Sequence, residues 1–239
     1  KESCDGVDND CDGWIDCAGW GFFPLAGDAS NDLEGGPNGS VQGTQATAGP
    51  SGQENTALLF DGDDDTLDVG DPNFGGAGFT VAGWFRLDAL EAGSTRLLFQ
   101  EGVLELAMHE VDGNFELRLS VTNSDGEEKI VAVETGGPEA EFLGSWAYLA
   151  AVWDRTTLQL LANDVGESVE FSGIPASSSL DAPLYVMSAP SLTSYSAGAV
   201  SELFVSSCGL PDEDLTALYD GDGDGVPCEG LKQREMKKV

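Results

Sequence analysis

The sequence predicts an all-β protein, an antiparallel β-sandwich or jelly roll, with a short calcium-binding loop at each end. Three observations support this prediction. Short runs of alternating or β-branched residues recur along most of the 239-residue chain, and Gly, Asp, Asn or Pro turns separate them. Helical periodicity is almost absent. Aspartates alternate with other residues near both ends, in the spacing of calcium ligands.

The composition limits the classes of partner. The chain has 43 acidic and 10 basic residues and a formal net charge of -33, so phosphate backbones and anionic membranes are repelled, and we expect no nucleic-acid partner. We expect no membrane insertion either, because no apolar run of about 18 residues occurs. The chain opens on Lys1 without a leader, which indicates a signal peptide that was removed or lay upstream. Hydrophobic residues make up 41% of the chain, enough for one sizeable core.

The first element is the acidic loop "CDGVDNDCDGWIDC", from Cys4 to Cys17. Hard oxygen ligands at every second position wrap a cation of Ca²⁺ size, and Gly13 allows the bend that brings the later ligands round. The predicted ligands are the carboxylates of Asp8, Asp10, Asp12 and Asp16 and the backbone carbonyl of Trp14. The alternative is a solvated linker rich in Asx turns. The alternation, the glycine and the flanking cysteines together favour calcium.

The predicted strands follow between the two acidic loops. They cover residues 56–62, 66–70, 79–88, 95–102, 103–111, 115–122, 129–134, 145–154, 157–164, 183–189 and 199–207. Trp84, Trp146 and Trp153 fall within these runs, and we expect them to pack. The stretch 210–220, "LPDEDLTALYD", is predicted as a short helix. Its apolar face consists of Leu210, Leu215, Leu218 and Tyr219.

A second acidic loop, "DGDGDGVPCE", closes the chain. Its predicted calcium ligands are Asp220, Asp222, Asp224, the carbonyl of Val226 and Glu229. Lys232 occupies the twelfth position, where a full EF-hand has glutamate, so the site is shortened. A flexible Gly-Asp linker is the alternative. The segment 231–239 carries four of the ten basic residues and either docks on an acidic patch or, as we favour, forms a solvated tail.

The cysteines lie only at the two ends, which indicates an oxidising, extracellular setting. A bridge between Cys4 and Cys17 is favoured, because the incoming and outgoing chains of a wrapped ion loop lie close together. A bridge between Cys208 and Cys228 would fold the last loop back onto the sandwich. Cys11 is then left for a neighbour, and a bridge from the first loop to the C-terminal one is the alternative.

Catalysis is not expected. Glu110 and Asp112 share a strand face, but Asp112-Gly113 is a hairpin signal that sends Glu116 onto the next strand. The paired carboxylates of a glycoside hydrolase are therefore not visible, and we predict no catalytic residue. His109, the single histidine, is expected as a surface or half-buried strand residue.

A further acidic turn lies inside the sandwich. Its residues Asp61, Asp63, Asp64 and Asp65, with Asp28, Asn31 and Asp32 of an earlier loop, are candidates for another cation site. Turn chemistry alone explains Asp-Gly, so a charged hairpin turn is favoured.

Several of these segments resemble known families. Residues 2–17 resemble the Asp-rich, Cys-bracketed metal-binding repeat of secreted bacterial proteins, and residues 220–229 resemble the core of the Excalibur-type calcium motif. Five blocks resemble, in order, a laminin-G-like, concanavalin A-like jelly roll: residues 20–43, 57–70, 79–88, 144–165 and 197–220. The last resemblance implies that the first and last strands lie side by side, with both acidic loops at one edge.

These expectations define a domain plan and a function. The plan is a calcium-binding repeat at 1–17, a jelly roll at 18–219, a calcium-binding loop at 220–230 and a basic tail at 231–239. The function is a secreted or cell-surface, non-catalytic recognition module with Ca²⁺ as its cofactor, which by resemblance binds a glycan or a surface protein. The alternative is a structural subunit of a calcium-stabilised extracellular fibre, which binds copies of itself.

Overall fold

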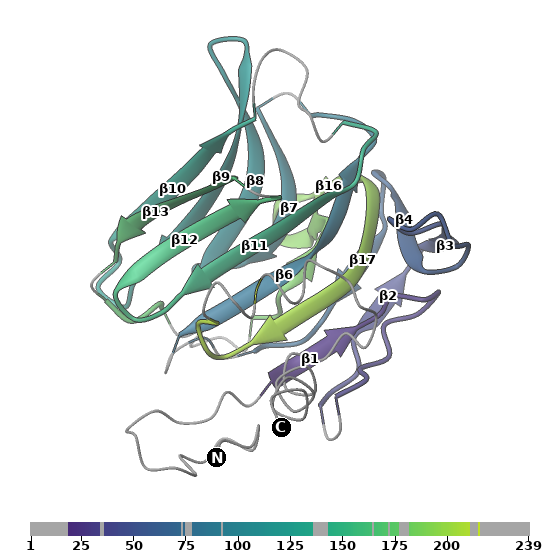
Figure 1. The fold of residues 1–239 in the computed structure, drawn as a ribbon, viewed down its shortest axis with the longest axis horizontal. Helices are drawn as coiled ribbons and strands as arrows, with labels where there is room; N and C mark the ends of the chain where they lie inside the picture. Colours follow the sequence, from purple (N-terminus) through teal and green to yellow (C-terminus); the bar gives the residue numbers. More distant parts are fainter. Residues whose placement is uncertain are drawn as a thin grey trace, which may run out of the picture.

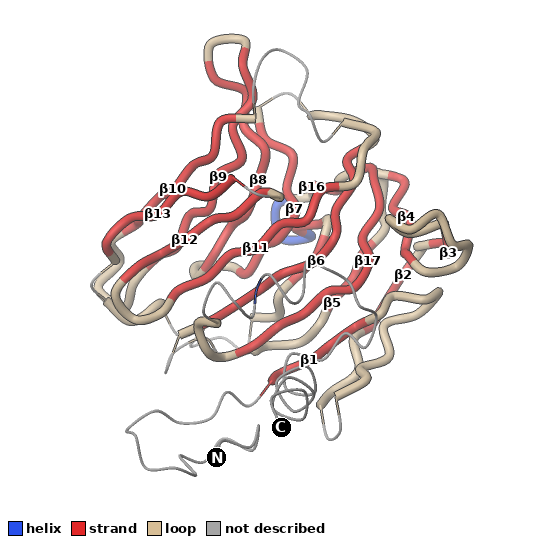
Figure 2. The backbone as a smooth tube through the Cα atoms, in the orientation of Figure 1, coloured by secondary structure: helices blue, strands red, loops and turns tan. Residues whose placement is uncertain are grey.

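Two antiparallel sheets lie face to face in the computed structural model (Figure 1; Figure 2). The structure describes residues 19–33, 36–72, 74, 78–91, 93–135, 143–163, 165–171, 173–176, 182–210 and 215. Both sheets consist of short strands joined by turns, and the predicted all-β sandwich is confirmed. Among the described residues, no helix is long and apolar enough to cross a membrane.

Sheet A has eight strands. Their order is β13 (Val165–Glu170), β12 (Thr157–Ala162), β11 (Ala147–Trp153), β6 (Phe79–Leu87), β17 (Ala197–Ser206), β4 (Ala57–Asp61) and β3 (Gln45–Thr47), with β1 (Gly19–Phe23) paired to β17. Residues 197–200 of β17 pair with β4, and residues 203–206 pair with β1. A bulge between these halves places Glu202 at a φ of 52°.

Sheet B has seven strands. Their order is β10 (Glu128–Glu134), β9 (Asn114–Thr122), β8 (Leu104–Val111), β7 (Ser94–Gln100), β14 (Tyr185–Val186), β5 (Thr66–Asp68) and β2 (Ser40–Gln42). A two-stranded ribbon of β15 (Ser188–Ala189) and β16 (Ser194–Tyr195) contacts β7, and the 3-10 helix η1 (Pro190–Leu192) connects its strands. The predicted hairpin between β8 and β9 is confirmed, since Val111 pairs with Asn114 and Asp112 and Gly113 both have positive φ.

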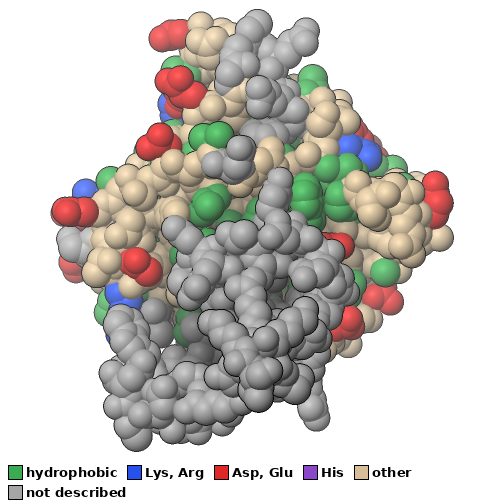
Figure 3. All heavy atoms as spheres, in the orientation of Figure 1, with side chains coloured by type: hydrophobic (Ala, Val, Ile, Leu, Met, Phe, Trp, Pro, Cys, Tyr) green, Lys and Arg blue, Asp and Glu red, His purple; other side chains and the backbone are tan. Residues whose placement is uncertain are grey.

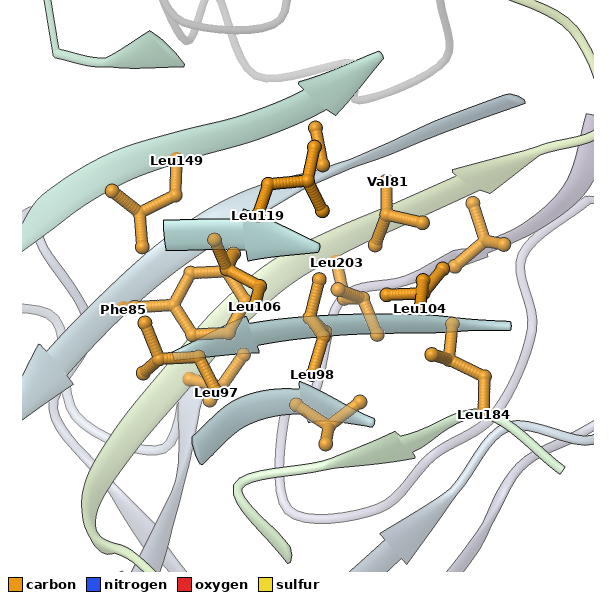
Figure 4. Close-up of a cluster of buried hydrophobic side chains, with 14 of the residues drawn as sticks. Val81, Phe85, Leu97, Leu98, Leu104, Leu106, Leu119, Leu149, Leu184 and Leu203 are labelled. Atoms are coloured by element: carbon orange, nitrogen blue, oxygen red, sulfur yellow. The ribbon is translucent and has the colours of Figure 1, made fainter. Parts of the chain in front are cut away.

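The core lies between the sheets and takes alternate residues from each strand. Figure 4 shows leucine, valine and phenylalanine side chains from both sheets meeting there. Those from sheet A include Val81, Phe85, Leu149 and Leu203, those from sheet B include Leu98, Leu106 and Leu119, and Leu184 lies just before β14. All of them are at most 2% exposed. Because inward and outward positions alternate along a strand, this core also fixes which side chains reach the two outer faces.

The first and last described strands lie side by side, as the family resemblance implies. Gly19 of β1 is opposite Ser206 of β17, and Phe23 is opposite Leu203. The chain therefore enters the sandwich at Gly19 next to the point where it leaves β17. The acidic loops at 1–17 and 220–230 lie outside the described residues, so their predicted proximity remains a prediction.

After β17 the chain crosses the end of sheet A through a glycine contact. A Cβ built on Gly78 would lie 2.4 Å from the carbonyl oxygen of Trp153 and 2.5 Å from the amide nitrogen of Gly209. A Cβ on Gly209 would lie 2.5 Å from the same oxygen of Trp153. Only glycine fits at both positions. This close backbone approach carries the chain from Cys208 to Leu210 at the outer face of sheet A.

Some elements were not predicted. β13 has the sequence VGESVE and mostly exposed residues, so it lacks the apolar alternation that marks a strand, and it forms by pairing with β12. The strands β2, β3 and β16 have only two or three residues each. The helix η1 was also missed. Of the predicted helix at 210–220, the structure describes Leu210 and a helical Leu215.

Candidate functional site

The outer face of sheet A is apolar and is covered in part by the segment that follows β17. A second buried cluster forms there from Ala82, Tyr148, Ala150, Val152 and Leu215, with Trp84, Leu161 and Leu210 packed against it. The Trp84 and Tyr148 rings meet edge to face with centroids 5.6 Å apart, and burial raises the pKa of the Tyr148 hydroxyl. Figure 3 shows hydrophobic side chains between polar ones in the middle of this view. This face resembles a second small core.

The outer face of sheet B is polar, and several of its charged side chains are half-buried. The alternate residues of β8 and β9, such as Leu106 and Leu119, point into the core, so the residues between them point outward. We call five half-buried residues of this face the sheet B cluster. They are Arg96 on β7, Glu105 and His109 on β8, and Glu116 and Arg118 on β9.

Strand register brings the sheet B cluster together. Ala107 of β8 is paired with Arg96 on one side and with Arg118 on the other. In the next row, His109 is opposite Glu116. Neighbouring strands are about 4.8 Å apart, so the two arginine Cα atoms are about 10 Å apart across the alanine. Ala107 itself has no exposed surface.

Two ion pairs organise the sheet B cluster. Arg118 Nε donates to Glu116 Oε2 (3.0 Å), and Nη2 lies 2.9 Å from the same oxygen. Arg96 Nε lies 3.1 Å from Glu105 Oε1, but this nitrogen is buried and its N–H is not aligned for a hydrogen bond. All four side chains are between 19% and 32% exposed. Each pair therefore offers a donor and an acceptor side by side at the surface.

His109 is held in its neutral form by its surroundings. Burial lowers the pKa of the imidazole, and the positive charge of Arg118 lowers it further. Arg96 acts in the same direction, whereas Glu105 and Glu116 act against it. A neutral imidazole has one donor and one acceptor nitrogen, so His109 can serve a hydroxyl group in either role.

Aromatic side chains lie at the β14 end of the same face. Phe99 of β7 pairs with Glu105 on one side and with Tyr185 on the other, which places the three residues in one row. Burial raises the pKa of Tyr185, and Asp68 and Tyr195 raise it further, so the two tyrosines lie close together. Tyr185 and Tyr195 are half-buried. Half-buried aromatic rings beside polar groups suit the mixed polar and apolar surface of a sugar.

The acidic turn after β4 is both a turn and a carboxylate cluster. Asp65 Oδ2 accepts the N–H of Asp61 (2.9 Å), and Asp61 Oδ1 accepts the N–H of Asp63 (2.8 Å), as the turn interpretation predicts. One carboxylate oxygen each from Asp61, Asp64 and Asp65 also lie within 4.8 Å of one another. Burial of Asp65, 5% exposed, raises its pKa, and the charges of Asp61 and Asp64 add to this. These hard oxygens fit a divalent cation.

The earlier acidic loop uses its side chains locally. Asn31 Oδ1 accepts the N–H groups of Phe22 (3.1 Å) and Leu33 (2.9 Å), and Asp28 Oδ1 accepts that of Ser30 (2.9 Å). These bonds shape the loop between β1 and β2. The grouped carboxylates are those of the Asp61 turn.

The predicted calcium ligands lie outside the described residues. These are Asp8, Asp10, Asp12, Trp14, Asp16, Asp220, Asp222, Asp224, Val226 and Glu229. Four of the five cysteines also lie outside them, and Cys208 is buried in the segment that crosses the end of sheet A. Both calcium sites and the disulfide pairing therefore remain predictions.

Several other expectations are tested by the described residues. Glu110 is exposed at the end of β8, Asp112 lies in the hairpin turn, and Glu116 lies on β9 opposite His109, so the compact carboxylate pattern does not form. His109 is half-buried in its strand, as expected. Trp153 is buried in the core. Trp84 packs on the outer face of sheet A.

Trp146 is half-buried, and Arg86 lies 5.4 Å from the centroid of its ring. The ring of Trp146 therefore packs against the guanidinium of Arg86 and not in the core. Sequence reasoning missed Arg96, Arg118 and Tyr185 as site residues. Each of these residues is a charged or aromatic residue between apolar neighbours in a strand. This pattern predicts that the side chain points outward, but it does not identify the residues beside it on other strands.

Comparisons with known proteins agree with this architecture. A family model described as "Concanavalin A-like lectin/glucanases superfamily" (Laminin_G_3) matches residues 61–216. No curated protein matches the sequence. Among solved structures, domain 4 of AbnA, a GH43 extracellular arabinanase from Geobacillus stearothermophilus, solved in complex with arabinotriose, has a TM-score of 0.63 and 14% identity. The match covers 84% of this chain and 98% of that domain.

The other similar structures include binding domains of bacterial toxins. The receptor-binding domain of a botulinum neurotoxin C/D mosaic serotype has a TM-score of 0.61 and 10% identity, over 85% of this chain and 51% of that one. The binding domain of botulinum neurotoxin DC in complex with SialylT has a TM-score of 0.57 and 9% identity, over 77% of this chain and 46% of that one. The chain thus spans about half of these toxin domains. At such identities the likeness shows the fold alone.

Proposed function

The chain belongs to the concanavalin A-like lectin/glucanases superfamily, and from this premise we propose that it is a secreted or cell-surface, non-catalytic module that binds a glycan on the outer face of sheet B. One observation carries the proposal. The sheet B cluster groups five half-buried polar side chains, next to half-buried tyrosines, on strands whose opposite sides form the core. Polar groups fixed on rigid strands are pre-organised for binding.

A comparison of the two outer faces favours that of sheet B as the glycan-binding surface. The apolar face of sheet A is already packed against Leu210 and Leu215. The sheet B cluster instead offers arginine, glutamate and histidine groups whose hydrogen-bonding capacity exceeds their mutual contacts. The similarity to an arabinanase domain solved with arabinotriose and to a toxin domain solved with SialylT supports a glycan as the ligand class.

The arrangement of carboxylates supports a non-catalytic role. A glycoside hydrolase needs one carboxyl group that carries a proton and a second one at a defined separation across the bond. Glu105 forms an ion pair with Arg96, and Glu116 accepts the Nε–H of Arg118, so each carboxylate is paired with a guanidinium on this face. Glu110 stands exposed at the hairpin end of β8. Incubation with polysaccharides is expected to release no reducing sugar.

Calcium is part of the proposal. The acidic loops at 1–17 and 220–230 carry the ligand spacing of calcium loops, and the three grouped carboxylates of the Asp61 turn supply hard oxygen atoms. Asp61, Asp64 and Asp65 would hold the ion at the turn. Burial raises the pKa of Asp65, and the charges of Asp61 and Asp64 raise it further; a cation there would offset this repulsion.

A glycan microarray tests the proposed function. The wild-type protein, with calcium present, is expected to bind a subset of glycans, and Arg118→Met is expected to lose this binding. Arg86→Met is the matched control, because Arg86 forms an ion pair with Asp88 (2.8 Å) of similar exposure on sheet A. A wild-type protein that binds no glycan, or equal losses in both variants, would contradict the proposal. Sedimentation of calcium-loaded protein as large assemblies would instead support the fibre-subunit function.

A further inference from the structure

We infer that the two arginine–glutamate pairs of the sheet B cluster recognise vicinal hydroxyl groups of a neutral saccharide, one diol at each pair, and that they select against uronic and sialic acids. This inference rests on the proposed glycan-binding function and assigns its ligand class. The pairs are Arg96 with Glu105 and Arg118 with Glu116.

The chemistry of a diol matches that of each pair. A guanidinium only donates hydrogen bonds and a carboxylate only accepts them, whereas a hydroxyl group does both. Of two neighbouring hydroxyls, one can accept from the arginine while the other donates to the glutamate. The planar guanidinium holds this donor in a fixed direction, which an ammonium group would not do. Charged partners also make each such bond about twice as strong as a neutral one.

The contacts within the Arg118–Glu116 pair leave capacity for a ligand. Nε of Arg118 donates to Oε2 of Glu116, and Nη2 lies 2.9 Å from the same oxygen. Among the described residues, neither Nη1 of Arg118 nor Oε1 of Glu116 forms a protein hydrogen bond of its own. The donor Nη1 of Arg118 and the acceptor Oε1 of Glu116 therefore remain available next to each other, while the ion pair fixes both side chains.

The Arg96–Glu105 pair is not an ideal ion pair by itself, which leaves room for a ligand hydroxyl as a third member. Its Nε is buried and close to the carboxylate, but it is poorly aligned with it. A buried N–H without an aligned acceptor is destabilising, so the pair has not settled into its best isolated geometry. The backbone around Arg96 is fixed from below, because Ser196 Oγ donates to its carbonyl oxygen (2.7 Å). The guanidinium is thus presented from a rigid position beside a register shift of β7.

The spacing of the pairs fits one short stretch of oligosaccharide. Arg96 and Arg118 flank Ala107 in one row, about 10 Å apart between Cα atoms. The neutral imidazole of His109 lies in the adjacent row, next to both pairs. At the other end, Tyr185 and Tyr195 offer aromatic surface for the C–H face of a neighbouring sugar unit.

Charge favours a neutral ligand. Each pair is neutral as a whole, so a carboxylate that approaches an arginine also approaches a glutamate. Two exposed acidic residues, Glu128 and Glu134, lie on the same face on the neighbouring strand β10, and Glu134 is opposite Glu116. The formal net charge of the whole chain is -33. An anionic sugar would therefore meet repulsion that a neutral sugar does not.

The test uses an array of neutral oligosaccharides, their uronic-acid and sialylated counterparts, and analogues that lack one hydroxyl of a vicinal pair. The wild type is expected to bind neutral members at least tenfold more tightly than acidic ones, and removal of one hydroxyl is expected to weaken binding about tenfold or more. Arg118→Lys and Glu116→Gln keep the size of the side chain but remove the fork or the charge. Each is expected to weaken binding of the neutral probe by about tenfold or more, with an unchanged melting temperature.

The outcomes separate this inference from the proposed function. If the wild type binds glycans but prefers acidic ones, or if Arg118→Lys and Glu116→Gln bind the neutral probe within threefold of the wild type, the diol assignment is wrong while glycan binding stands. If no glycan binds, both proposals fail. Arg86→Met again serves as the control and is expected to bind the neutral probe as the wild type does.

Discussion

The hydroxyl of Thr80 on β6 donates to the carbonyl oxygen of Cys208 (2.8 Å) and accepts the N–H of Leu210 (2.9 Å), 130 residues further along the chain. Both bonds are at least partly buried, and they fasten the chain where it turns onto sheet A. Thr80→Val keeps the shape but loses both bonds. We expect the free energy of unfolding to fall by about 2 kcal/mol.

A thermal melt measures this loss, which corresponds to about 4–8 °C in a domain of this size. Thr95→Val is a matched control, because Thr95 is also buried but accepts only one backbone N–H, that of Glu91 (2.7 Å). Its melting temperature should fall about half as far. Equal losses in the two variants would show that the Thr80 bonds have no special role at the crossing.

The glycine contact beneath the same crossing gives a second prediction. Gly78→Ala places a Cβ within 2.5 Å of two backbone atoms at a φ of +131°, so we expect a loss of about 4 kcal/mol or more. Gly102→Ala also has a positive φ, +72°, but nothing lies within 4 Å of its Cβ, so about 1–2 kcal/mol is expected. Chemical denaturation of both variants measures the difference. A Gly78→Ala protein as stable as Gly102→Ala would rule out the close approach.

The single histidine makes the electrostatics of the sheet B cluster measurable. Because the folded pKa of His109 lies below its ordinary value of 6.5, the unfolded chain binds more protons between the two values. The free energy of unfolding should therefore fall as the pH falls from about 6.5 through the folded pKa, and His109→Gln should flatten this dependence.

Nuclear magnetic resonance titration of the His109 ring protons follows the same group directly, because the sequence has one histidine. Arg118→Gln is expected to raise the His109 pKa, since the charge of Arg118 lowers it. Arg155→Gln, an exposed arginine near the β11–β12 turn, should leave it unchanged. A pKa above 6.5 in the wild type would show that Glu105 and Glu116 dominate instead.

Removal of calcium is expected to destabilise the protein. With extracellular-type affinity near 10⁻⁴ M and about a millimolar of free ion, each occupied site contributes about 1.4 kcal/mol. Calorimetry should show at least two bound Ca²⁺ per chain and a lower melting temperature in the presence of a chelator. Asp10→Asn and Asp222→Asn should each remove one equivalent. An unchanged melting temperature after chelation would contradict the calcium proposal.

Strands that bury at least one face could be predicted from the sequence. Strands whose residues stay exposed could not be predicted. β6 and β11 contribute long apolar runs, Phe79–Leu87 and Ala147–Trp153, and both were predicted within two residues. β13 was missed because its residues stay exposed and its conformation comes from pairing with β12. The hydrophobic pattern within a segment predicts which of its residues are buried. Whether the segment pairs with another strand depends on residues elsewhere in the chain.

The candidate site was largely hidden for the same reason. Alternation places Glu105 and His109 on the outward side of β8, and this much is readable from sequence. That Arg96 and Arg118 flank Ala107 depends on the register of three strands and on a register shift in β7. A one-residue slip in either pairing would send an arginine toward the core. The site is therefore a product of tertiary register.

The pairing of β1 with the end of β17 determines how the sandwich responds to mechanical force. Gly19 lies opposite Ser206, so the chain enters one strand and leaves the other at the same end of an antiparallel pair. Tension between the two flanking segments then loads the hydrogen bonds of this pair one after another, starting from Gly19, rather than all at once. Under tension from both ends, β1 would peel away at low load while the leucine-rich core between the sheets stayed closed.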